Sequence, residues 1–394
     1  MGLYVSDDVI VVNNHLENAI FCYSREAHMK YTINEDAWLL LKYVYSHPNI
    51  EKNIIAEKFL LEDDVINEFV ELRILSFEKQ NDFHNIKEIN ELNAARIVFE
   101  ITDNCNLKCK HCFGSYGEHK NNLQFDIFEK IINEAAKLGV YEVTLTGGEP
   151  TLHPNIEEIL KVLYQKGMIV TVFSNLTNDK ITSIMVEKSR YISKVITSIE
   201  SHNSHIHDEF RGKKGALDKT IHSINILKQT TISIAVNVVV GNHNVDHVLD
   251  LIKWLKYFNV EVVVDIVSPE GRAKSISTCY KHIFEQMQKI LTDEFQIESK
   301  NCGVGKRFVY VCPNGDIVPC SSMKQIVVGN ISKNYSLCEG YLDVFNVFKK
   351  VDGCNNKEEA CHNCNGGCRA RAFIETHDLS AADPLYCGIY KYSV

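Results

Sequence analysis

The sequence lacks long hydrophobic stretches. No run of 18 or more consecutive apolar residues occurs, so we expect no segment that crosses a membrane and no membrane partner. The N-terminal stretch MGLYVSDDVI has no basic segment followed by an apolar run, which argues against a secretion signal. Internal repeats and low-complexity tracts are also missing, which excludes solenoid and fibrous classes.

Excess positive charge is missing as well. The net charge is −9, and residues 1–90 account for −8 of it with 16 acidic and 8 basic side chains. A surface that binds nucleic acid needs the opposite sign. The charge distribution therefore predicts no nucleic-acid partner.

Cysteine, by contrast, is abundant. The chain has 394 residues, 45% of them apolar, which is enough for a large core, and it contains 14 cysteines. Without an export signal, a large chain of this kind is expected in a reducing, cytoplasmic compartment. Thiols at this density in such a compartment bind metal or carry redox chemistry.

Residues 1–90 begin with strand-like apolar runs and continue with three short helical patterns. The runs are Val9–Val12, Ala19–Tyr23 and a third near Tyr31. The first helix is predicted to start after Asn34, a good N-cap, and the third to use Val65, Phe69 and Leu72 as its apolar face. Strands combined with three short helices resemble a winged helix-turn-helix.

Residues 95–270 alternate between apolar strands and amphipathic helices. The predicted strands are Arg96–Ile101, Tyr141–Leu145, Ile169–Phe173, Lys194–Ile199, Ile232–Val240 and Val260–Ile266. One intervening helix carries Phe128, Ile131, Ile132 and Ala135 on one face and ends before Gly139. Six consecutive β/α units predict an α/β fold with a parallel sheet, closed into a partial barrel whose site lies at the C-terminal ends of the strands.

Three cysteines follow the first of these strands directly. Cys105, Cys109 and Cys112 are spaced CxxxCxxC. Three thiolates on one tight loop can hold three corners of a 4Fe–4S cluster and leave the fourth iron open to a small molecule. The spacing alone also fits a zinc knuckle or three unrelated buried cysteines.

The second strand ends in the sequence Thr146-Gly147-Gly148-Glu149-Pro150. The two glycines would allow a ligand to approach the backbone closely, and the Glu149 carboxylate could accept a hydrogen bond from an ammonium group. Two motifs in this order, each at the end of a strand, favour a cluster with a bound ligand over the zinc alternative.

With these residues the chain resembles the radical S-adenosylmethionine (SAM) superfamily, over residues 95–270. The resemblance implies that Cys105, Cys109 and Cys112 ligate a 4Fe–4S cluster whose fourth iron is chelated by SAM. It also implies that Gly147, Gly148, Glu149 and Pro150 contact the methionine end of SAM. In this family the bound pair yields a 5′-deoxyadenosyl radical.

Three further positions match the superfamily with departures. Asn175 resembles the end of the third strand, although Leu176 stands where glycine is common. Ser198 resembles the fourth-strand motif, in which Glu200 replaces aspartate, and Arg211 follows. The resemblance implies that Asn175, Ser198 and Arg211 contact SAM, whereas Asn175 and Ser198 also fit ordinary turn residues at strand ends.

A second group of cysteines lies in residues 300–394, where periodicity is weak. Its spacing, including Cys364-Asn-Gly-Gly-Cys368-Arg369, resembles the SPASM domain of peptide-modifying radical SAM enzymes. By this resemblance two further 4Fe–4S clusters are expected, making three in all. One would be held by Cys302, Cys312, Cys320 and Cys368, and the other by Cys354, Cys361, Cys364 and Cys387. A zinc ribbon at Cys361 and Cys364 is the alternative.

The domain order then resembles that of maturases of ribosomally made peptides. We expect a leader-recognition domain at residues 1–90, a radical SAM partial barrel at 91–275, and a linker helix with the SPASM domain at 276–394. The resemblance implies a precursor peptide whose leader binds residues 1–90, a thioether or carbon–carbon crosslink as product, and a flavodoxin- or ferredoxin-like reductant. Two alternatives remain open: a radical SAM enzyme acting on a protein or small metabolite, and an iron–sulfur transcription regulator.

Overall fold

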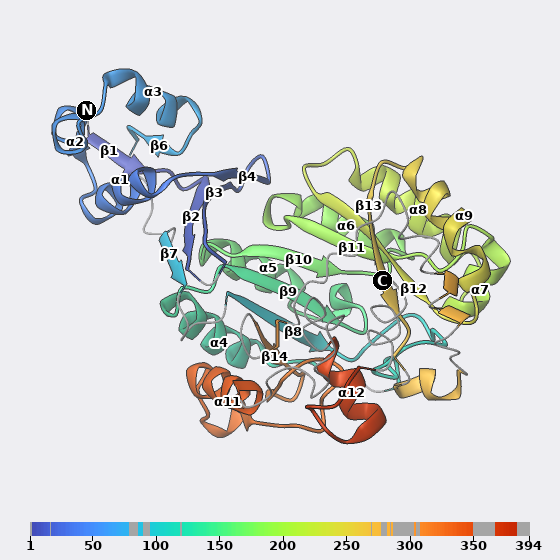
Figure 1. Cartoon of the computed structure of the whole chain (residues 1–394). Coiled ribbons are helices and arrows are strands. Elements are labelled where there is room, and N and C mark those ends of the chain that lie inside the picture. The colour runs from blue at the N-terminus through green and yellow to red at the C-terminus, as the bar shows by residue number, and fades with distance from the viewer. Residues whose placement is uncertain are drawn as a thin grey trace.

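The structure is a computed structural model that describes residues 2–15, 17–78, 86–89, 95–118, 120–268, 270–276, 282–283, 285–286, 303–304, 308–349 and 367–383. These residues form three sheets. The N-terminal sheets and helices stand at one end of the molecule, and the large sheet fills its body (Figure 1). The fold is therefore of the mixed α/β class that the sequence predicts.

The N-terminal part contains two small sheets and three helices. One sheet has the order β5 (Ile50–Glu51), β1 (Gly2–Val5) and β6 (Leu75–Ser76), and the other has the order β4 (Met29–Thr32), β3 (Ala19–Ser24), β2 (Val9–Asn14) and β7 (Ile86–Ile89). The helices are α1 (Glu35–Ser46), α2 (Lys52–Phe59) and α3 (Asp63–Glu71).

The predicted helix start at Asn34 is confirmed, because its side chain accepts a hydrogen bond from the amide of Ala37 at 2.9 Å. One prediction in this region is wrong. Leu72, assigned to the buried face of the third helix, is 46% exposed, because α3 ends at Glu71 and the chain turns outward there. Ile66 is the fully buried side chain of that helix.

The sheet that contains β2, β3 and β7 packs directly on the body of the protein. Phe21 on β3 meets Tyr141 edge-on with ring centroids 5.7 Å apart, within an apolar cluster that also contains Ile10 and Ile89. Arg25 lies 3.5 Å from the ring centroid of Tyr164 and donates to the Tyr164 carbonyl at the end of helix α5 (Ile156–Gln165). The apolar cluster therefore crosses the boundary predicted at residue 90.

Six parallel strands form the body of the large sheet, in the order β13-β12-β11-β10-β9-β8. Their bounds are β8 (Arg96–Thr102), β9 (Glu142–Gly147), β10 (Ile169–Phe173), β11 (Lys194–Ser198), β12 (Ser233–Val240) and β13 (Glu261–Ile266). From β9 onward, each strand pairs in parallel with the strand that precedes it along the chain. All six lie where the sequence predicts them, to within one or two residues.

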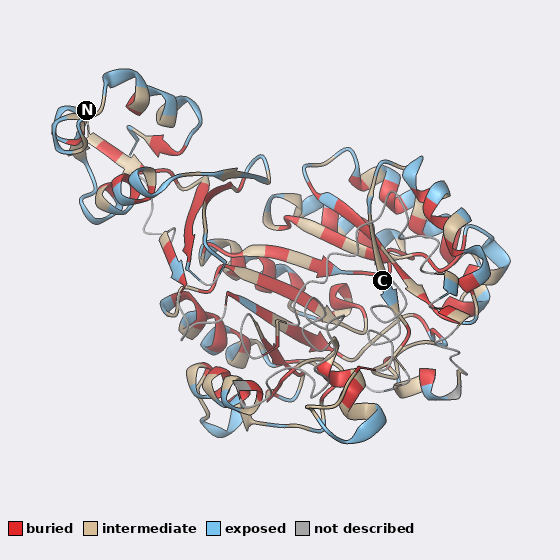
Figure 2. Ribbon diagram, viewed as in Figure 1, coloured by how far each residue is buried: buried red, intermediate tan, exposed pale blue. Residues whose placement is uncertain are grey.

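Helices cover the outer face of these strands. They are α4 (Phe125–Lys137), α5, α6 (Asp179–Glu187), α7 (Ser204–Arg211), α8 (Ala216–Leu227) and α9 (Val248–Lys256), with short 3-10 helices at Pro150–Leu152, Ser189–Tyr191, Val245–His247, Gly271–Ser275 and Ile331–Lys333. Phe128, Ile131, Ile132 and Ala135 of α4 are fully buried, as predicted, and Gly139 has a φ of +82° just after the helix. Buried residues follow the strands and the sheet-facing sides of the helices (Figure 2).

A C-terminal segment extends the same sheet, which the sequence does not predict. β14 (Phe308–Val311) pairs in parallel with β8, and β15 (Asp316–Val318) and β16 (Gly329–Asn330) follow as antiparallel strands. Helices α11 (Leu337–Lys349) and α12 (Arg369–Thr376) lie beside this extension (Figure 1). The segment that carries Cys312 and Cys320 is thus attached to the first strand of the parallel sheet.

Among the described residues no helix is long and apolar enough to cross a membrane.

Candidate functional site

The loop after β8 brings Cys105, Cys109 and Cys112 together at the C-terminal edge of the sheet. The amide of Cys112 donates to the carbonyl of Cys109 at 3.3 Å, which closes a tight turn between the two thiols. The amide of Tyr116 donates to the Cys112 sulfur at 3.4 Å. Hydrogen bonds of this kind to sulfur tune thiolates that ligate iron–sulfur clusters.

Two of these thiols lie in an environment that opposes ionisation. Burial, with smaller contributions from the nearby Glu149, Cys109 and Cys112, raises the pKa of Cys105 to about 12. Burial also raises the pKa of Cys109. Thiolates here need a cation close by, and bound iron is a cation of the required kind.

The two glycines at the end of β9 allow the backbone there to lie close to the cysteine loop. A Cβ atom on Gly147, whose φ is +130°, would lie 2.1 Å from the Thr102 carbonyl oxygen, and one on Gly148 would lie 2.2 Å from that of Asn104. The amides of Gly148 and Glu149 donate to these two carbonyls, each at 2.8 Å. The close approach that these glycines permit is therefore between two backbone segments of the protein.

Glu149 is fully buried and its carboxylate is surrounded by neutral donors. It accepts hydrogen bonds from the amide and hydroxyl of Thr151 at 3.3 and 2.8 Å, from the Ser174 hydroxyl at 3.0 Å and from the Asn175 amide at 2.8 Å. Burial raises the pKa of Glu149, while these donors oppose the rise. Pro150 is the first residue of the 3-10 helix that follows.

Asn175, at the end of β10, ties that strand to the cysteine loop. Its Nδ2 donates to Asn106 Oδ1 at 2.7 Å, and its Oδ1 accepts from the amide and hydroxyl of Thr177. Leu176 has a φ of +52°, the conformation that favours glycine, and its side chain is fully buried in the core. Leucine here combines a strained backbone with well-packed apolar surface.

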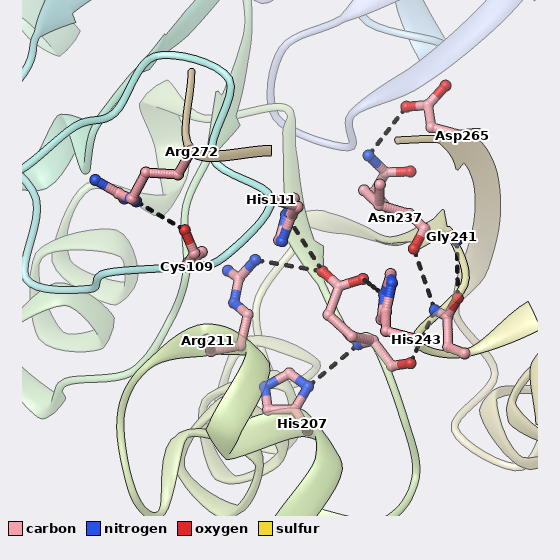
Figure 3. Close-up of polar contacts among 12 residues, drawn as sticks. Cys109, His111, His207, Arg211, Asn237, Gly241, His243, Asp265 and Arg272 are labelled. Carbon is pink, nitrogen blue, oxygen red and sulfur yellow. Dashed lines mark hydrogen bonds and ion pairs between the residues drawn. The ribbon is translucent and has the colours of Figure 1, made fainter. Parts of the chain in front are cut away.

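Ser198 ends β11, and Glu200 follows it among Arg211, His111 and His243, three side chains that Figure 3 labels. Glu200 is fully buried and lies 3.4 Å from Arg211, 3.6 Å from His111 and 3.8 Å from His243. Burial alone would raise the pKa of Glu200, but these neighbours outweigh it and lower the pKa to about 2.

Arg211 is the cation that balances Glu200 near neutral pH. Burial lowers the pKa of His111 to about 4, so this imidazole is then uncharged. Burial opposes the charge of Arg211 too, but Cys109 and Glu200 outweigh burial and raise its pKa. The guanidinium thus lies between the buried carboxylate and the cysteine loop.

Sequence reasoning named Glu200 only as a departure from a motif and did not find its partners. His111 stands inside the cysteine motif, whereas His243 comes from the loop after β12 and stacks on Phe210 with ring centroids 3.6 Å apart. Phe210 also stacks on His111, with the two ring centroids 4.9 Å apart. No sequence pattern marks His243, because it reaches the site only through the fold.

Two further segments hold the cysteine loop from outside. A Cβ on Gly212, after α7, would lie 2.7 Å from the Lys108 carbonyl oxygen, and one on Gly271 would lie 2.3 Å from that of Phe113. Arg272 donates to the carbonyl of Cys109 at 2.9 Å (Figure 3) and to that of Tyr116 at 3.0 Å. The sequence indicated Arg211, next to Gly212, but predicted neither of these contacts nor the segment at Gly271 and Arg272, because the groups contacted on the cysteine loop are backbone carbonyls.

The second cysteine group is described in part. Cys312 follows β14 and is buried, and burial raises its pKa to about 12. Cys320 and Cys368 are half-buried, and the Cys368 amide donates to Asp383 at 2.7 Å. Cys302, Cys354, Cys361, Cys364 and Cys387 lie outside the described residues, as does Cys279.

The two remaining cysteines have different surroundings. Cys22 is fully buried, and burial raises its pKa to about 12, which is the environment of an inert thiol. Cys338 is half-buried in the first turn of α11.

The cysteine loop fits an iron–sulfur cluster. Among the described residues, no three His, Cys, Asp or Glu side chains are grouped to coordinate one metal ion. A 4Fe–4S cluster asks each thiolate to bind a different iron, so its ligands surround the cluster instead of meeting at one point. Three thiols on one loop, an amide directed at Cys112 and the buried cation of Arg211 match that demand.

A comparison with protein families decides the class. The sequence profile of the Radical SAM superfamily matches residues 99–255, which contain the cysteine loop and strands β9 to β12. The matched residues form a radical SAM domain. Radical SAM enzymes use a 4Fe–4S cluster and SAM, so the chain is an enzyme with these cofactors.

Two relatives of this radical SAM chain differ in what their names describe. The AdoMet-dependent heme synthase of Methanosarcina barkeri is 27% identical over 350 residues, covering 76% of this chain and 97% of the relative. The antilisterial bacteriocin subtilosin biosynthesis protein AlbA of Bacillus subtilis is 30% identical over 269 residues, covering 63% of this chain and 59% of AlbA.

Solved radical SAM structures share the fold. Streptococcus suis SuiB bound to its precursor peptide SuiA has a TM-score of 0.67 and 16% identity, and the match covers 98% of this chain and 99% of SuiB. Native anSMEcpe with bound AdoMet has a TM-score of 0.60 and 17% identity, over 75% of this chain and 94% of that protein. The likeness to SuiB therefore extends over about a quarter more of this chain.

Proposed function

We propose that this radical SAM enzyme modifies a ribosomally made precursor peptide. The observation that carries the proposal is the extent of the likeness to SuiB, which covers 98% of this chain where the likeness to anSMEcpe covers 75%. SuiB is bound to a precursor peptide in its structure, and AlbA is named for bacteriocin biosynthesis. The product in this proposal is a thioether or carbon–carbon crosslink.

In the proposal, Cys105, Cys109 and Cys112 are the cluster ligands. When bound, the reduced cluster and SAM supply a 5′-deoxyadenosyl radical that removes a hydrogen atom from the substrate. The chain holds its three thiols on a loop fixed from both sides by backbone contacts at Gly148 and Gly271. Such fixation keeps the ligands in place and limits water at the reacting centre.

We assign the SAM-facing role to Gly147, Gly148, Glu149, Pro150, Asn175, Ser198 and Arg211. Glu149 has the strongest case, because among the described residues its buried carboxylate accepts hydrogen bonds from the neutral donors Thr151, Ser174 and Asn175 alone. A buried carboxylate without a cation favours a ligand that brings one, and the amino group of SAM is an ammonium ion.

We assign two further clusters to the C-terminal cysteines. Cys302, Cys312, Cys320 and Cys368 would hold one, and Cys354, Cys361, Cys364 and Cys387 the other. The attachment of β14 to β8 supports this assignment, because it keeps Cys312 on the same sheet as the first cysteine loop. Clusters within one rigid sheet can exchange electrons at a fixed separation. A flavodoxin- or ferredoxin-like protein in a reducing, cytoplasmic compartment would supply the first electron.

The leader of the precursor would bind residues 1–90, and we assign it to the outer edge of β4. Among the described strands β4 pairs with β3 alone, and its residues are mostly exposed. The Ile33 amide donates to Ile20, so by antiparallel alternation the amides of Lys30 and Thr32 point away from β3. Outward amides on an exposed edge can pair with an added peptide strand.

The edge assignment is tested by removing one outward amide. Thr32→Pro should weaken binding of the precursor to the whole enzyme at least tenfold, and Thr32→Val, which keeps the amide, should bind as the wild type does. Isothermal titration of the intact enzyme with the precursor measures this. Equal affinity for all three proteins would exclude the β4 edge.

A radical SAM enzyme of tetrapyrrole metabolism is the second candidate. The heme synthase likeness favours it, since that match covers 97% of the relative. It gives no role to the quarter of this chain that lies outside the matched 76%. Nucleic-acid binding has no support from the acidic N-terminal part, which carries 16 acidic and 8 basic side chains.

The decisive experiment is coexpression with short peptides encoded near the enzyme, followed by mass spectrometry. A crosslink between side chains changes the peptide mass by about two hydrogens and should need an intact cysteine loop. A triple variant with Cys105, Cys109 and Cys112 changed to Ala should make no 5′-deoxyadenosine and leave the peptide unmodified. An unmodified peptide with the wild-type enzyme, together with heme formation, would favour the second candidate.

A further inference from the structure

An ion pair between a buried glutamate and a partly exposed lysine joins the two cysteine-bearing parts of the protein. Glu100 on β8 is 2% exposed, and its side chain lies on the opposite face of the strand from Phe99 and Ile101, which pack into the main core. Lys324 Nζ lies 2.9 Å from Glu100 Oε1 and 2.7 Å from Oε2. Neither residue belongs to the site described above.

On one side the pair reaches the first cysteine loop. Lys324 Nζ donates to the Tyr116 hydroxyl at 3.2 Å and lies 5.1 Å from the centroid of the same ring. The Tyr116 amide in turn donates to the Cys112 sulfur at 3.4 Å. Two hydrogen bonds and one residue therefore separate the ammonium group from the cluster ligand.

On the other side the pair reaches the C-terminal cysteines. The Tyr310 hydroxyl donates to Glu100 Oε2 at 2.8 Å, and Tyr310 precedes Cys312 by two residues on β14. Lys324 follows Cys320 by four residues. The pair therefore contacts the strand that leads into Cys312 and the segment that follows Cys320.

Stability alone gives little reason for such a pair. Removing the Glu100 carboxylate from water costs free energy that attraction to the partly exposed Lys324 only partly offsets, and an apolar side chain of similar size often stabilises a protein as well. The position of the pair is the informative feature, because a charge in a buried region acts over a longer distance than one at the surface. Both cysteine groups lie within its reach.

We propose that Glu100 and Lys324 are positioning residues shared by the two iron–sulfur sites, with opposite effects on the clusters at Cys112 and Cys312. The inference rests on the proposed function, since it takes clusters at both places. Lys324 favours the reduced, more negative state of each cluster, and Glu100 opposes it. Together they fix Tyr116, and through it the hydrogen bond to the Cys112 sulfur.

The test is a redox titration of the reconstituted holoenzyme, followed by electron paramagnetic resonance. Lys324→Met should lower the midpoint potentials of both clusters, because a cation is lost. Glu100→Gln should raise both, because an anion is lost. The double variant should fall between them, and Lys324→Arg, which keeps the charge, should stay near the wild type.

Matched controls separate a local charge effect from a general one. Lys333→Met removes an exposed lysine from the same segment and should leave both potentials unchanged. Repeating the titration with Cys105, Cys109 and Cys112 changed to Ala isolates the C-terminal clusters. The double variant buries no unpaired charge, so it keeps the test open if a single variant unfolds.

The outcomes distinguish this inference from the proposed function. The shared role would be overturned if the potentials do not move, if both single variants shift them in the same direction, or if only one cluster shifts. The proposed function would remain intact in each of these cases. Iron and sulfide analysis that finds a single cluster in the wild type would overturn both.

Discussion

The ends of strands β9 and β11 each bury a glutamate completely, but the two carboxylates have different surroundings. Within the described part of the chain, Glu149, after β9, accepts only from neutral donors, and burial raises its pKa. Glu200, after β11, faces Arg211 at 3.4 Å, and its neighbours lower its pKa to about 2 despite burial. One charge is balanced within the protein, and the other is left for a ligand cation.

The largest expected effect comes from breaking the balanced site. Glu200→Ala leaves Arg211 buried without its carboxylate partner, and we expect a loss of about 3–5 kcal/mol in the free energy of unfolding. Urea denaturation of the metal-free protein measures this. The double change Glu200→Ala with Arg211→Met removes both charges and should recover much of the loss. Equal stability of the single variant and the wild type would contradict the ion-pair interpretation.

The next effect concerns the unbalanced site. Glu149→Gln keeps the size of the side chain but removes the charge, so it should weaken SAM binding by about ten- to a hundredfold, the range for a lost charge-assisted hydrogen bond. Equilibrium dialysis with the reconstituted enzyme measures the affinity. Glu142→Gln, at the opposite end of the same strand, is the matched control and should bind normally. Unchanged affinity in Glu149→Gln would show that the SAM ammonium is bound elsewhere.

The two glutamates should also give opposite dependences of stability on pH. The lowered pKa of Glu200 contributes stability above its ordinary value of 4.5 that is lost as pH falls towards about 2. The raised pKa of Glu149 destabilises the fold increasingly as pH rises above 4.5. The loss of unfolding free energy in Glu200→Gln relative to the wild type should therefore shrink as pH falls from 4.5 towards about 2. Glu149→Gln should instead gain stability relative to the wild type as pH rises above 4.5. Parallel slopes would remove the contrast between the sites.

The smallest effect tests a third buried charge, far from the site. Lys87 on β7 is 1% exposed, and its ammonium group donates a hydrogen bond to the Lys166 carbonyl at 3.3 Å. Burial lowers the pKa of Lys87 from 10.5 to about 7. The unfolded chain then binds the extra proton between these two values, so the wild type gains stability as pH rises from 7 to 10.5. Lys87→Met should be more stable at pH 7, and its advantage should shrink towards pH 10, as thermal unfolding would measure. An advantage that does not change with pH would refute the lowered pKa.

Local sequence was sufficient for the parallel sheet and for the cysteine loop. The six strands are continuous apolar runs, because helices cover them, and such runs are visible without knowledge of their neighbours. Cys105, Cys109 and Cys112 lie within eight residues, so their spacing carries the chemistry by itself. Leu176 stands where glycine is common in the resembling family, and the structure gives it the left-handed conformation.

The tertiary structure decided the rest, because the deciding contacts join residues far apart in the chain. Glu200 meets His243, Glu100 meets Lys324, and β14 adds to β8 some 200 residues away. Side-chain charge also depends on the neighbours that folding supplies: the sequence presents Glu149 and Glu200 as two similar acids at strand ends. Only the packing of Arg211 beside one of them makes a balanced ion pair there and leaves an uncompensated carboxylate at the other.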